Sequence, residues 1–434
     1  MRPDDREILR LAIPAFGALV AEPLYVLVDT AVVGHLGTDQ LAGLGVASSV
    51  LLTSYFLFVF LAYGTTGAVA RLVGAGEHRE AARQGLQGMW LALLLSILVG
   101  VVLAVAAPAI IDALGADGAV RENALIYLRI SLIGTPALFV TMAGTGYLRG
   151  LQDTRTPLAV AVGTSVVNLV VQLVLIYGFD LGIGASAAST VLAQTGGAAV
   201  YLHRVTRSAR SLDVALGPDW GSIRRLAVVG RDLFIRTAAL RGSLLVATAV
   251  VTRMGRTETA AHQVAFEIWS FLALSLDAVA IAGQAITGRA LGAGDVVGAR
   301  RAGRRMLQWG FCAGMVGGLV VIGLRPWLGE LFSDDPEVVV LAGFLMWWVA
   351  LLQPVNGVVF VLDGLLMGAG DVRFLAQAMA GAFVAFVAVA GVVLATGAGV
   401  GWLWAALGVL MTARLIPLWR RFDHGAWAVT GATR

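Results

Sequence analysis

The chain has 434 residues, of which 58% are hydrophobic and only 13% are charged, with a formal net charge of +4. A soluble domain carries about 25% charged residues, so this composition excludes that class. The single cysteine excludes a disulfide framework and a thiolate metal site. The arginines lie mostly in short loops between apolar runs, which indicates membrane topology and not a nucleic-acid partner.

Apolar runs long enough to cross the ~30 Å hydrocarbon core of a bilayer recur along the whole chain. Together with the loop residues between them, they predict an all-α polytopic membrane protein with twelve transmembrane helices. The predicted spans are residues 8–33, 46–71, 86–111, 124–148, 157–178, 183–203, 226–252, 260–288, 304–324, 338–367, 373–395 and 400–419.

The loops of this twelve-helix arrangement differ in charge between its two sides. Arginine is concentrated on one side, whereas the opposite loops are poor in arginine and carry acids. Arg253 and Arg256 are the exceptions. Because cytoplasmic loops carry an excess of Arg and Lys, both termini are expected in the cytoplasm. We expect a multi-pass protein of a bacterial-type cytoplasmic membrane.

An internal repeat divides the chain. ARLVGAG at 70–76 recurs as GRALGAG at 288–294, and RGLQDTR at 149–155 recurs as MGAGDVR at 367–373, each 218 residues further along. Six helices per half give both repeats the same orientation, which predicts two pseudo-symmetric lobes around a central cavity. The predicted parts are an N-terminal lobe (1–203), a cytoplasmic linker (204–225), a C-terminal lobe (226–425) and a tail (426–434).

Two carboxylates lie within the first predicted helix. Glu22 and Asp29 are seven residues apart and share one face with Tyr25, which could hydrogen-bond Asp29. A carboxylate at the centre of a spanning helix costs about 2.5–3.5 kcal/mol on insertion scales, and such residues usually mark ion pathways. The repeat has Ala247 and Leu240 at the matching positions, so the acids belong to the first lobe alone. A structural hydrogen bond, or a place at the membrane interface, is the alternative.

Other polar residues occur inside predicted spans. Asn168 and Gln172 are one helical turn apart, and Thr190 lies in the middle of the next span. They are either functional or simple hydrogen-bonding contacts between helices.

The seventh span carries arginines, and later spans carry acids that can pair with them. The set lines a substrate path or forms structural ion pairs, and the sequence leaves both open. Its members are Arg236, Arg241, Glu267, Asp277 and Asp363.

Sites for enzymatic chemistry are not evident. Glycine-rich loops are present, but without a single lysine they cannot form a P-loop. The five histidines lack metal-ligand spacing, and nothing resembles a catalytic triad. We therefore expect no enzyme, no cofactor and no resident metal ion.

Several ordered motifs resemble the multidrug and toxic compound extrusion (MATE) family. These are VDTAVVGHLGTDQLAGLGVA, the repeated GAG segments, RGLQDTRTP and NLVVQLVLIYGFDLGIGASAAST. GRDLFIRT and AAHQVAFEIWSF are similar to its DNA-damage-inducible protein F (DinF) branch. The resemblance covers essentially the whole chain. It implies two six-helix lobes, a V-shaped cavity, and antiport of organic compounds against protons or sodium.

The resemblance also implies roles for individual residues. Asp29 matches the family's first-helix acid, which is proposed to be protonated or to bind the coupling cation. Asn168 and Thr190 match its partners, and Pro14 matches the proline about which the first helix is proposed to bend. Tyr25 and Tyr127 match further polar positions of the N-terminal lobe.

One departure from the family pattern bears on the coupled ion. The family commonly has an aspartate four residues after the asparagine, where this chain has Gln172. Replacing a carboxylate by an amide weakens a sodium site, whereas a proton needs only one titratable acid. Proton coupling through Asp29 is therefore expected, with sodium at Asp29, Asn168 and Thr190 as the alternative.

The function expected from these observations is a monomeric antiporter that exports lipophilic, often cationic, small molecules through a lipid bilayer. The alternative within the same superfamily is a flippase for a lipid-linked precursor. A flippase would be expected to carry more basic charge in its cavity than Arg236 and Arg241 supply.

Overall fold

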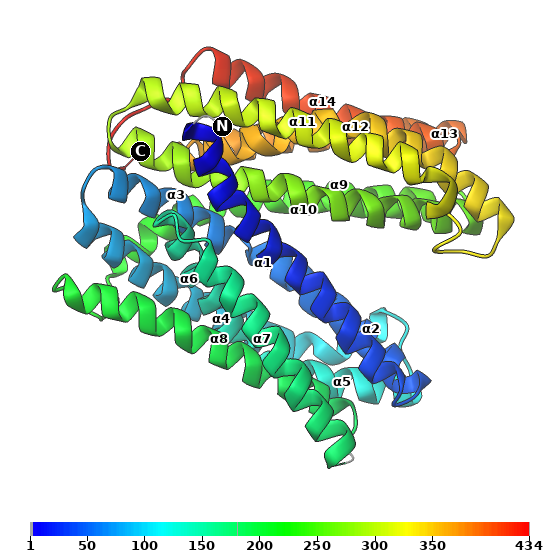
Figure 1. Cartoon of the computed structure of the whole chain (residues 1–434). Coiled ribbons are helices and arrows are strands. Elements are labelled where there is room, and N and C mark those ends of the chain that lie inside the picture. Colours follow the sequence, from blue (N-terminus) through cyan, green and yellow to red (C-terminus); the bar gives the residue numbers. More distant parts are fainter. Residues whose placement is uncertain (1–2, 180, 434) are drawn as a thin grey trace. The chain divides into compact units, whose positions relative to one another are not determined.

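The computed structural model describes residues 3–179 and 181–433, and these residues form helices without a strand (Figure 1). The first half contains α1 (Pro3–Gly34), α2 (Thr38–Phe58), α3 (Phe60–Gly74), α4 (His78–Ala113), α5 (Gly118–Ile133), α6 (Thr135–Gly150), α7 (Arg155–Leu173), the π-helical turn Val174–Gly178 and α8 (Ile183–Ser211). The second half contains α9 (Trp220–Thr252), α10 (Arg256–Gly292), α11 (Val296–Leu328), α12 (Pro336–Gly368), α13 (Val372–Thr396) and α14 (Val400–Asp423).

These helices account for the twelve predicted spans. Within the described residues, ten are long and apolar enough to cross a membrane, counting α2 with α3 and α7 with its π-helical turn as one span each, and the bent pair α5 and α6 makes an eleventh. The remaining helix, α8, is 29 residues long but rich in Ala, Gly, Ser and Thr. Most helices extend beyond the predicted spans because their polar ends continue past the apolar run.

The predicted span 124–148 is the main correction to the helices. It is two helices, α5 and α6, which meet at a 50° bend after Gly134. Pro136 stands at the start of α6, where its missing N–H costs nothing. Its repeat partner, Pro354, lies inside the unbroken α12.

The chain divides into two compact units, each described by itself. The first unit is Gly17–Gly230, and the second comprises residues 3–16 with Arg231–Arg434 as far as the structure describes them. This differs from the sequence-based division, which placed all of 1–203 in one lobe. Asp5 joins the second unit because it accepts hydrogen bonds from Arg305 and Trp309. The start of α9 belongs to the first unit, where Gly230 lies against the Phe60 ring.

Both units repeat the same close helix contact. On α6, a side chain at Gly146 would collide with the carbonyl oxygen of Ala62, and on α12 a side chain at Gly364 would collide with that of Ala280. These two pairs are separated by the 218-residue offset of the sequence repeat. Only glycine lets the backbones approach this closely, which explains why the repeat retains it.

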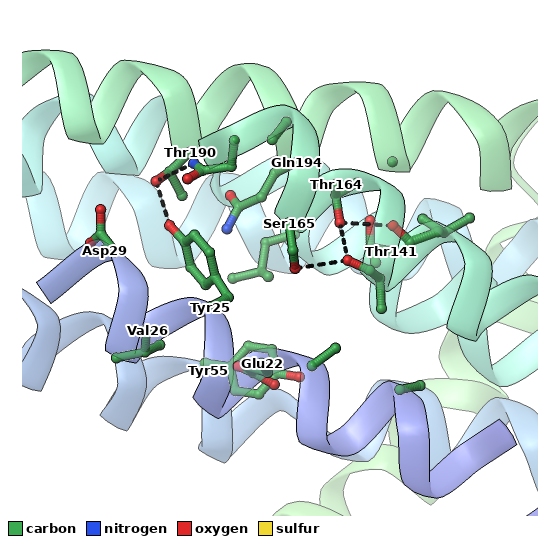
Figure 2. Close-up of a pocket in the computed structure, with 18 of the residues that line it drawn as sticks. Glu22, Tyr25, Val26, Asp29, Tyr55, Thr141, Thr164, Ser165, Thr190 and Gln194 are labelled. Atoms are coloured by element: carbon green, nitrogen blue, oxygen red, sulfur yellow. Dashed lines mark hydrogen bonds between the residues drawn. The ribbon is translucent and has the colours of Figure 1, made fainter. Parts of the chain in front are cut away.

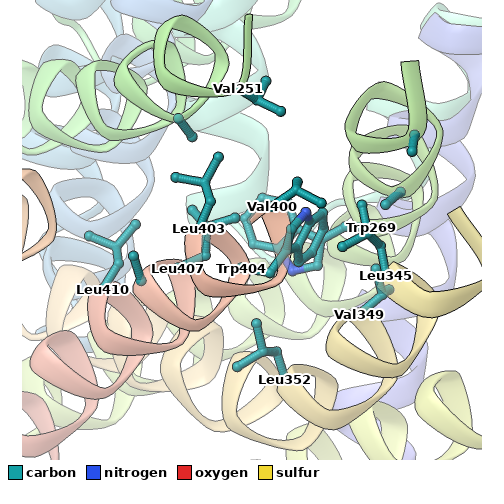
Figure 3. Packing of buried hydrophobic residues seen from close by; sticks show 14 of the residues in the cluster. Val251, Trp269, Leu345, Val349, Leu352, Val400, Leu403, Trp404, Leu407 and Leu410 are labelled. Carbon is teal, nitrogen blue, oxygen red and sulfur yellow. The ribbon is translucent and has the colours of Figure 1, made fainter. Parts of the chain in front are cut away.

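Each unit has its own apolar core. In the first, Leu44, Ile111 and Leu128 lie at the centre of a cluster that joins α2, α4 and α5. In the second, α12 packs against α10, α11 and α14. Figure 3 shows Trp404 of α14 in a larger cluster with Trp269 and Val349. The second unit is therefore filled by apolar side chains where α10, α12 and α14 meet.

Candidate functional site

Asp29 lies on α1 within the first unit and is 5% exposed. Its Oδ1 atom accepts hydrogen bonds from Gln172 Nε2 of α7 and from Ser186 Oγ of α8, both at 2.7 Å. The predicted neighbour Gln172 therefore contacts the acid directly. Ser186 was not singled out from the sequence, because a serine in the small-residue segment GASAAST is typical of helix packing.

A second hydrogen-bonded group lies beside the acid. The Tyr25 hydroxyl lies 2.7 Å from Thr190 Oγ1, and Asn168 Nδ2 donates to the same Thr190 oxygen at 3.0 Å (Figure 2). Tyr25 does not make the hydrogen bond to Asp29 that its position on the helix would allow. Helical side chains lean toward the N-terminus, so Tyr25 leans away from a residue one turn after it.

A cavity of about 310 Å³ lies within the first unit, next to these groups. Side chains from α1, α2, α5, α6, α7 and α8 line it, and the two acids in the apolar part of α1, Glu22 and Asp29, are among them. Tyr127, 4% exposed, also lines it. Glu22 is partly exposed and hydrogen-bonded by Tyr55. The volume and the few polar groups on an apolar wall are typical of a small-molecule site.

Two acceptor atoms near Asp29 have no hydrogen-bond donor. They are Asn168 Oδ1 and Gln172 Oε1, and both are buried. Buried polar atoms nearly always have a hydrogen-bond partner. Two buried oxygens without a donor therefore indicate a place where a ligand can bind. No group of three or more His, Cys, Asp or Glu residues that could hold a metal ion occurs in the described part of the chain.

Pro14 lies within α1, which continues through it from Pro3 to Gly34 without a break. It belongs to the residues of α1 that group with the second unit, whereas Asp29 belongs to the first. The proline and the acid thus lie on the same helix but belong to different compact units of the chain.

The predicted charged set of the C-terminal lobe is only partly brought together. Arg236 Nη2 donates to Asp363 Oδ2 at 2.6 Å, and Arg414, which the sequence analysis missed, donates to the same oxygen. All three side chains are at least nine-tenths buried. Glu267, by contrast, is exposed and accepts from Gln263 on its own helix, not from an arginine.

Arg241 and Asp277 are both half-buried in the second unit. The buried cluster of Arg236, Asp363 and Arg414 is an ion-paired group with internal hydrogen bonds, which favours the structural interpretation left open by the sequence.

Comparison with known proteins is consistent with this geometry. The family model described as MatE matches residues 14–174 and 234–395. Protein DETOXIFICATION 44, chloroplastic, of Arabidopsis thaliana is 33% identical, over 97% of this chain and 81% of its own length. DNA damage-inducible protein F of Escherichia coli K12 is 29% identical, over 98% and 94%.

The fold is also that of solved transporters. The structure of a MOP superfamily transporter from Pyrococcus furiosus has a TM-score of 0.86 at 20% identity, covering 98% of this chain and 95% of that one. Such a likeness confirms the all-helical two-lobe fold. With the family model and the relatives, it identifies the chain as a multi-pass membrane transporter of the multidrug and toxic compound extrusion (MatE) family.

Proposed function

We propose that the protein is a secondary antiporter that exports organic small molecules across the cytoplasmic membrane in exchange for protons, with Asp29 as the coupling acid. The observation that carries the proposal is a buried carboxylate lining a cavity large enough for a small molecule. An ionisable residue inside a membrane helix that faces a cavity is typical of a proton relay.

The hydrogen bonds of Asp29 suggest how protonation changes the site. An ionised carboxylate accepts strong, charge-assisted hydrogen bonds from Gln172 and Ser186, which hold α1 against α7 and α8. A proton on Asp29 removes the charge and weakens both bonds. α1 is then freer to leave these helices, so the two protonation states differ in conformational preference.

The same change alters substrate affinity. With Asp29 and Glu22 ionised, the α1 side of the cavity carries two negative charges and favours a cationic group. Protonation of Asp29 removes one of them. A proton entering from outside therefore lowers affinity for the exported cation on that side, which is the differential binding that exchange requires.

The donor set near Asp29 favours a proton over sodium. Asp29 accepts from one amide, Gln172, and one hydroxyl, Ser186, and among the described residues no second carboxylate is hydrogen-bonded to it. A sodium ion in this site would recruit the unpaired oxygens Asn168 Oδ1 and Gln172 Oε1. We further propose that the protein acts as a monomer with both termini in the cytoplasm, as the arginine distribution favours.

The test is substrate uptake by proteoliposomes under a proton gradient or a sodium gradient imposed separately. The proposal expects concentrative uptake of a lipophilic cationic dye with the proton gradient alone. Uptake with sodium alone would contradict proton coupling. Flipping of a lipid-linked precursor without any dye uptake would contradict the antiporter and identify a flippase.

A further inference from the structure

The cavity that contains the acids also contains a buried cation. Arg149, near the end of α6, is 8% exposed and lines the cavity. Its Nε atom is buried without a hydrogen-bond partner, and no ion pair joins its guanidinium to a described residue. A buried arginine without a carboxylate is costly, because its charge has lost water without gaining a counter-ion.

Arg149 differs from the buried arginines of the second unit. In the second unit, the buried arginines Arg236 and Arg414 share the carboxylate of Asp363. The acid closest in sequence to Arg149 is Asp153, and its oxygens accept instead from the backbone of Arg155 and from Thr156. The structure therefore leaves Arg149 with its charge directed at the cavity.

The repeat shows that the fold itself does not need this charge. The position matching Arg149 in the second unit is Met367, which is 4% exposed. An apolar side chain thus fills the equivalent position in the second unit. A costly charge that the scaffold does not require indicates a role in binding.

The groups around Arg149 are suited to an anionic oxygen group. The hydroxyls of Tyr201 and Thr145 lie next to each other, whereas the Tyr55 hydroxyl is hydrogen-bonded to Glu22. All three hydroxyl-bearing residues line the cavity. Arginine presents several N–H donors in a planar fork that matches a carboxylate, and hydroxyls add further donors.

We propose that Arg149 binds a carboxylate on the transported molecule, so that the cavity takes organic zwitterions as well as cations. The cationic part then lies toward Glu22 and Asp29 on α1. This inference rests on the proposed function, because it takes the cavity of the first unit as the substrate site. It adds an anion-recognition point that lipophilic cation export does not require.

Two dyes that differ at one group provide the test. Rhodamine 19 carries a free carboxylate, and rhodamine 6G is its ethyl ester. Binding of each dye to the full-length protein in lipid nanodiscs is measured by fluorescence anisotropy at pH 7.5. The measured quantity is the ratio of the two affinities, which cancels general effects of a substitution on the cavity.

Arg149→Met, which installs the residue of the second unit, should lower the affinity for rhodamine 19 relative to rhodamine 6G by about tenfold or more. Arg149→Lys keeps the charge and should retain part of the preference, and it serves if the methionine variant does not fold. Arg155→Met removes an exposed arginine at the start of α7 and should leave the ratio unchanged. An unchanged ratio in Arg149→Met overturns the inference.

The remaining outcomes are also decisive. If phosphatidylglycerol in the nanodisc lowers the relative affinity for rhodamine 19 in the unsubstituted protein but not in Arg149→Met, an anionic lipid headgroup occupies Arg149 and the inference is wrong. Binding is measured without a gradient. Failure of the proposed function would therefore appear as absent gradient-driven uptake, while the affinity ratio still reports on Arg149.

Discussion

The two units place different chemistry at equivalent positions of one repeated fold. In the first, Asp29 is held by Gln172 and Ser186 beside a cavity. In the second, the matching residues are buried in the hydrophobic cluster: Ala247, Ala390 and Trp404. α7 and α13 begin at Arg155 and Val372, within one residue of the 218-residue offset, so the positions correspond. Duplication preserved the helices, but at these three positions only the first unit has polar side chains.

The reverse comparison concerns the charges of the second unit. Asp363 and its two arginines form a closed, buried cluster. The positions matching Asp363 and Arg236 in the first unit are Thr145 and Ala18, both of which line the cavity. The Asp363 cluster of the second unit is therefore internally paired, whereas Asp29 and Arg149 of the first unit line a cavity.

The largest expected effect is on the stability of the second unit. Asp363→Asn leaves Arg236 and Arg414 buried without a full counter-charge, and should destabilise the protein by about 3–5 kcal/mol. Thermal unfolding of the purified protein measures this. Glu267→Gln, at an exposed acid of the same unit, is the control and should stay within about 0.5 kcal/mol of the unsubstituted protein. A stable Asp363→Asn protein that lost transport would make the cluster functional and break the comparison.

A smaller loss of stability is expected at Gln172, where the second unit has an apolar residue. Gln172→Ala, which installs the residue found at position 390, removes one donor to Asp29 and should cost about 1–3 kcal/mol. Together with Asp29→Ala it forms a double-mutant cycle. We expect a coupling energy of about 0.5–3 kcal/mol between the two sites. Strictly additive changes would mean that the hydrogen bond does not hold α1 in place.

The smallest effect on stability is expected at Asp219, an acid near the end of the first unit, and buried Asp5 of the second unit provides the contrast. Asp5 is buried against Arg305 and Trp309, whereas Asp219 is partly exposed and bound by Ser222, Arg83 and the backbone N–H of Gly221. The Ser222 hydroxyl, and then Arg83, lower the pKa of Asp219 from its usual 3.8 to about 2.

Because the folded pKa lies below the unfolded one, the stabilisation by Asp219 is fully present above pH 4 and is lost as the pH falls toward 2. The unfolding midpoints of the unsubstituted protein and Asp219→Asn should differ slightly at pH 7 and converge near pH 2. A gap that persists at pH 2 would assign the effect to something other than the charge. An exposed pair of this kind contributes little in any case.

Much of the fold could be predicted from residue patterns because hydrophobic run length and the repeat determine which segments are helical. Asp29 was identifiable because a carboxylate is costly in an apolar helix, and Gln172 because it lies one turn from Asn168. Side-chain direction was less accessible. Tyr25 contacts Thr190 and not Asp29, since helix spacing alone does not show which neighbour a long side chain reaches.

Three residues and one bend were missed from the sequence. Ser186 lies among small residues that are typical of close packing. Arg149 lies at the end of α6, where arginine is expected to face the cytoplasm, and only its burial distinguishes it. Arg414 lies within α14 and is likewise distinguished by its burial against Asp363. The bend between α5 and α6 was also missed, because Pro136 and Pro354 match in the sequence but only the first stands at a break.

Gradient-driven export by Asp29→Asn tests the central claim most directly. Asparagine keeps the size of the side chain and can still accept from Gln172 and Ser186, but it cannot carry a proton. In proteoliposomes with an imposed proton gradient, we expect the variant to bind a cationic dye and unfold close to the same temperature, yet to show no concentrative export. Export at the unsubstituted rate would contradict the account.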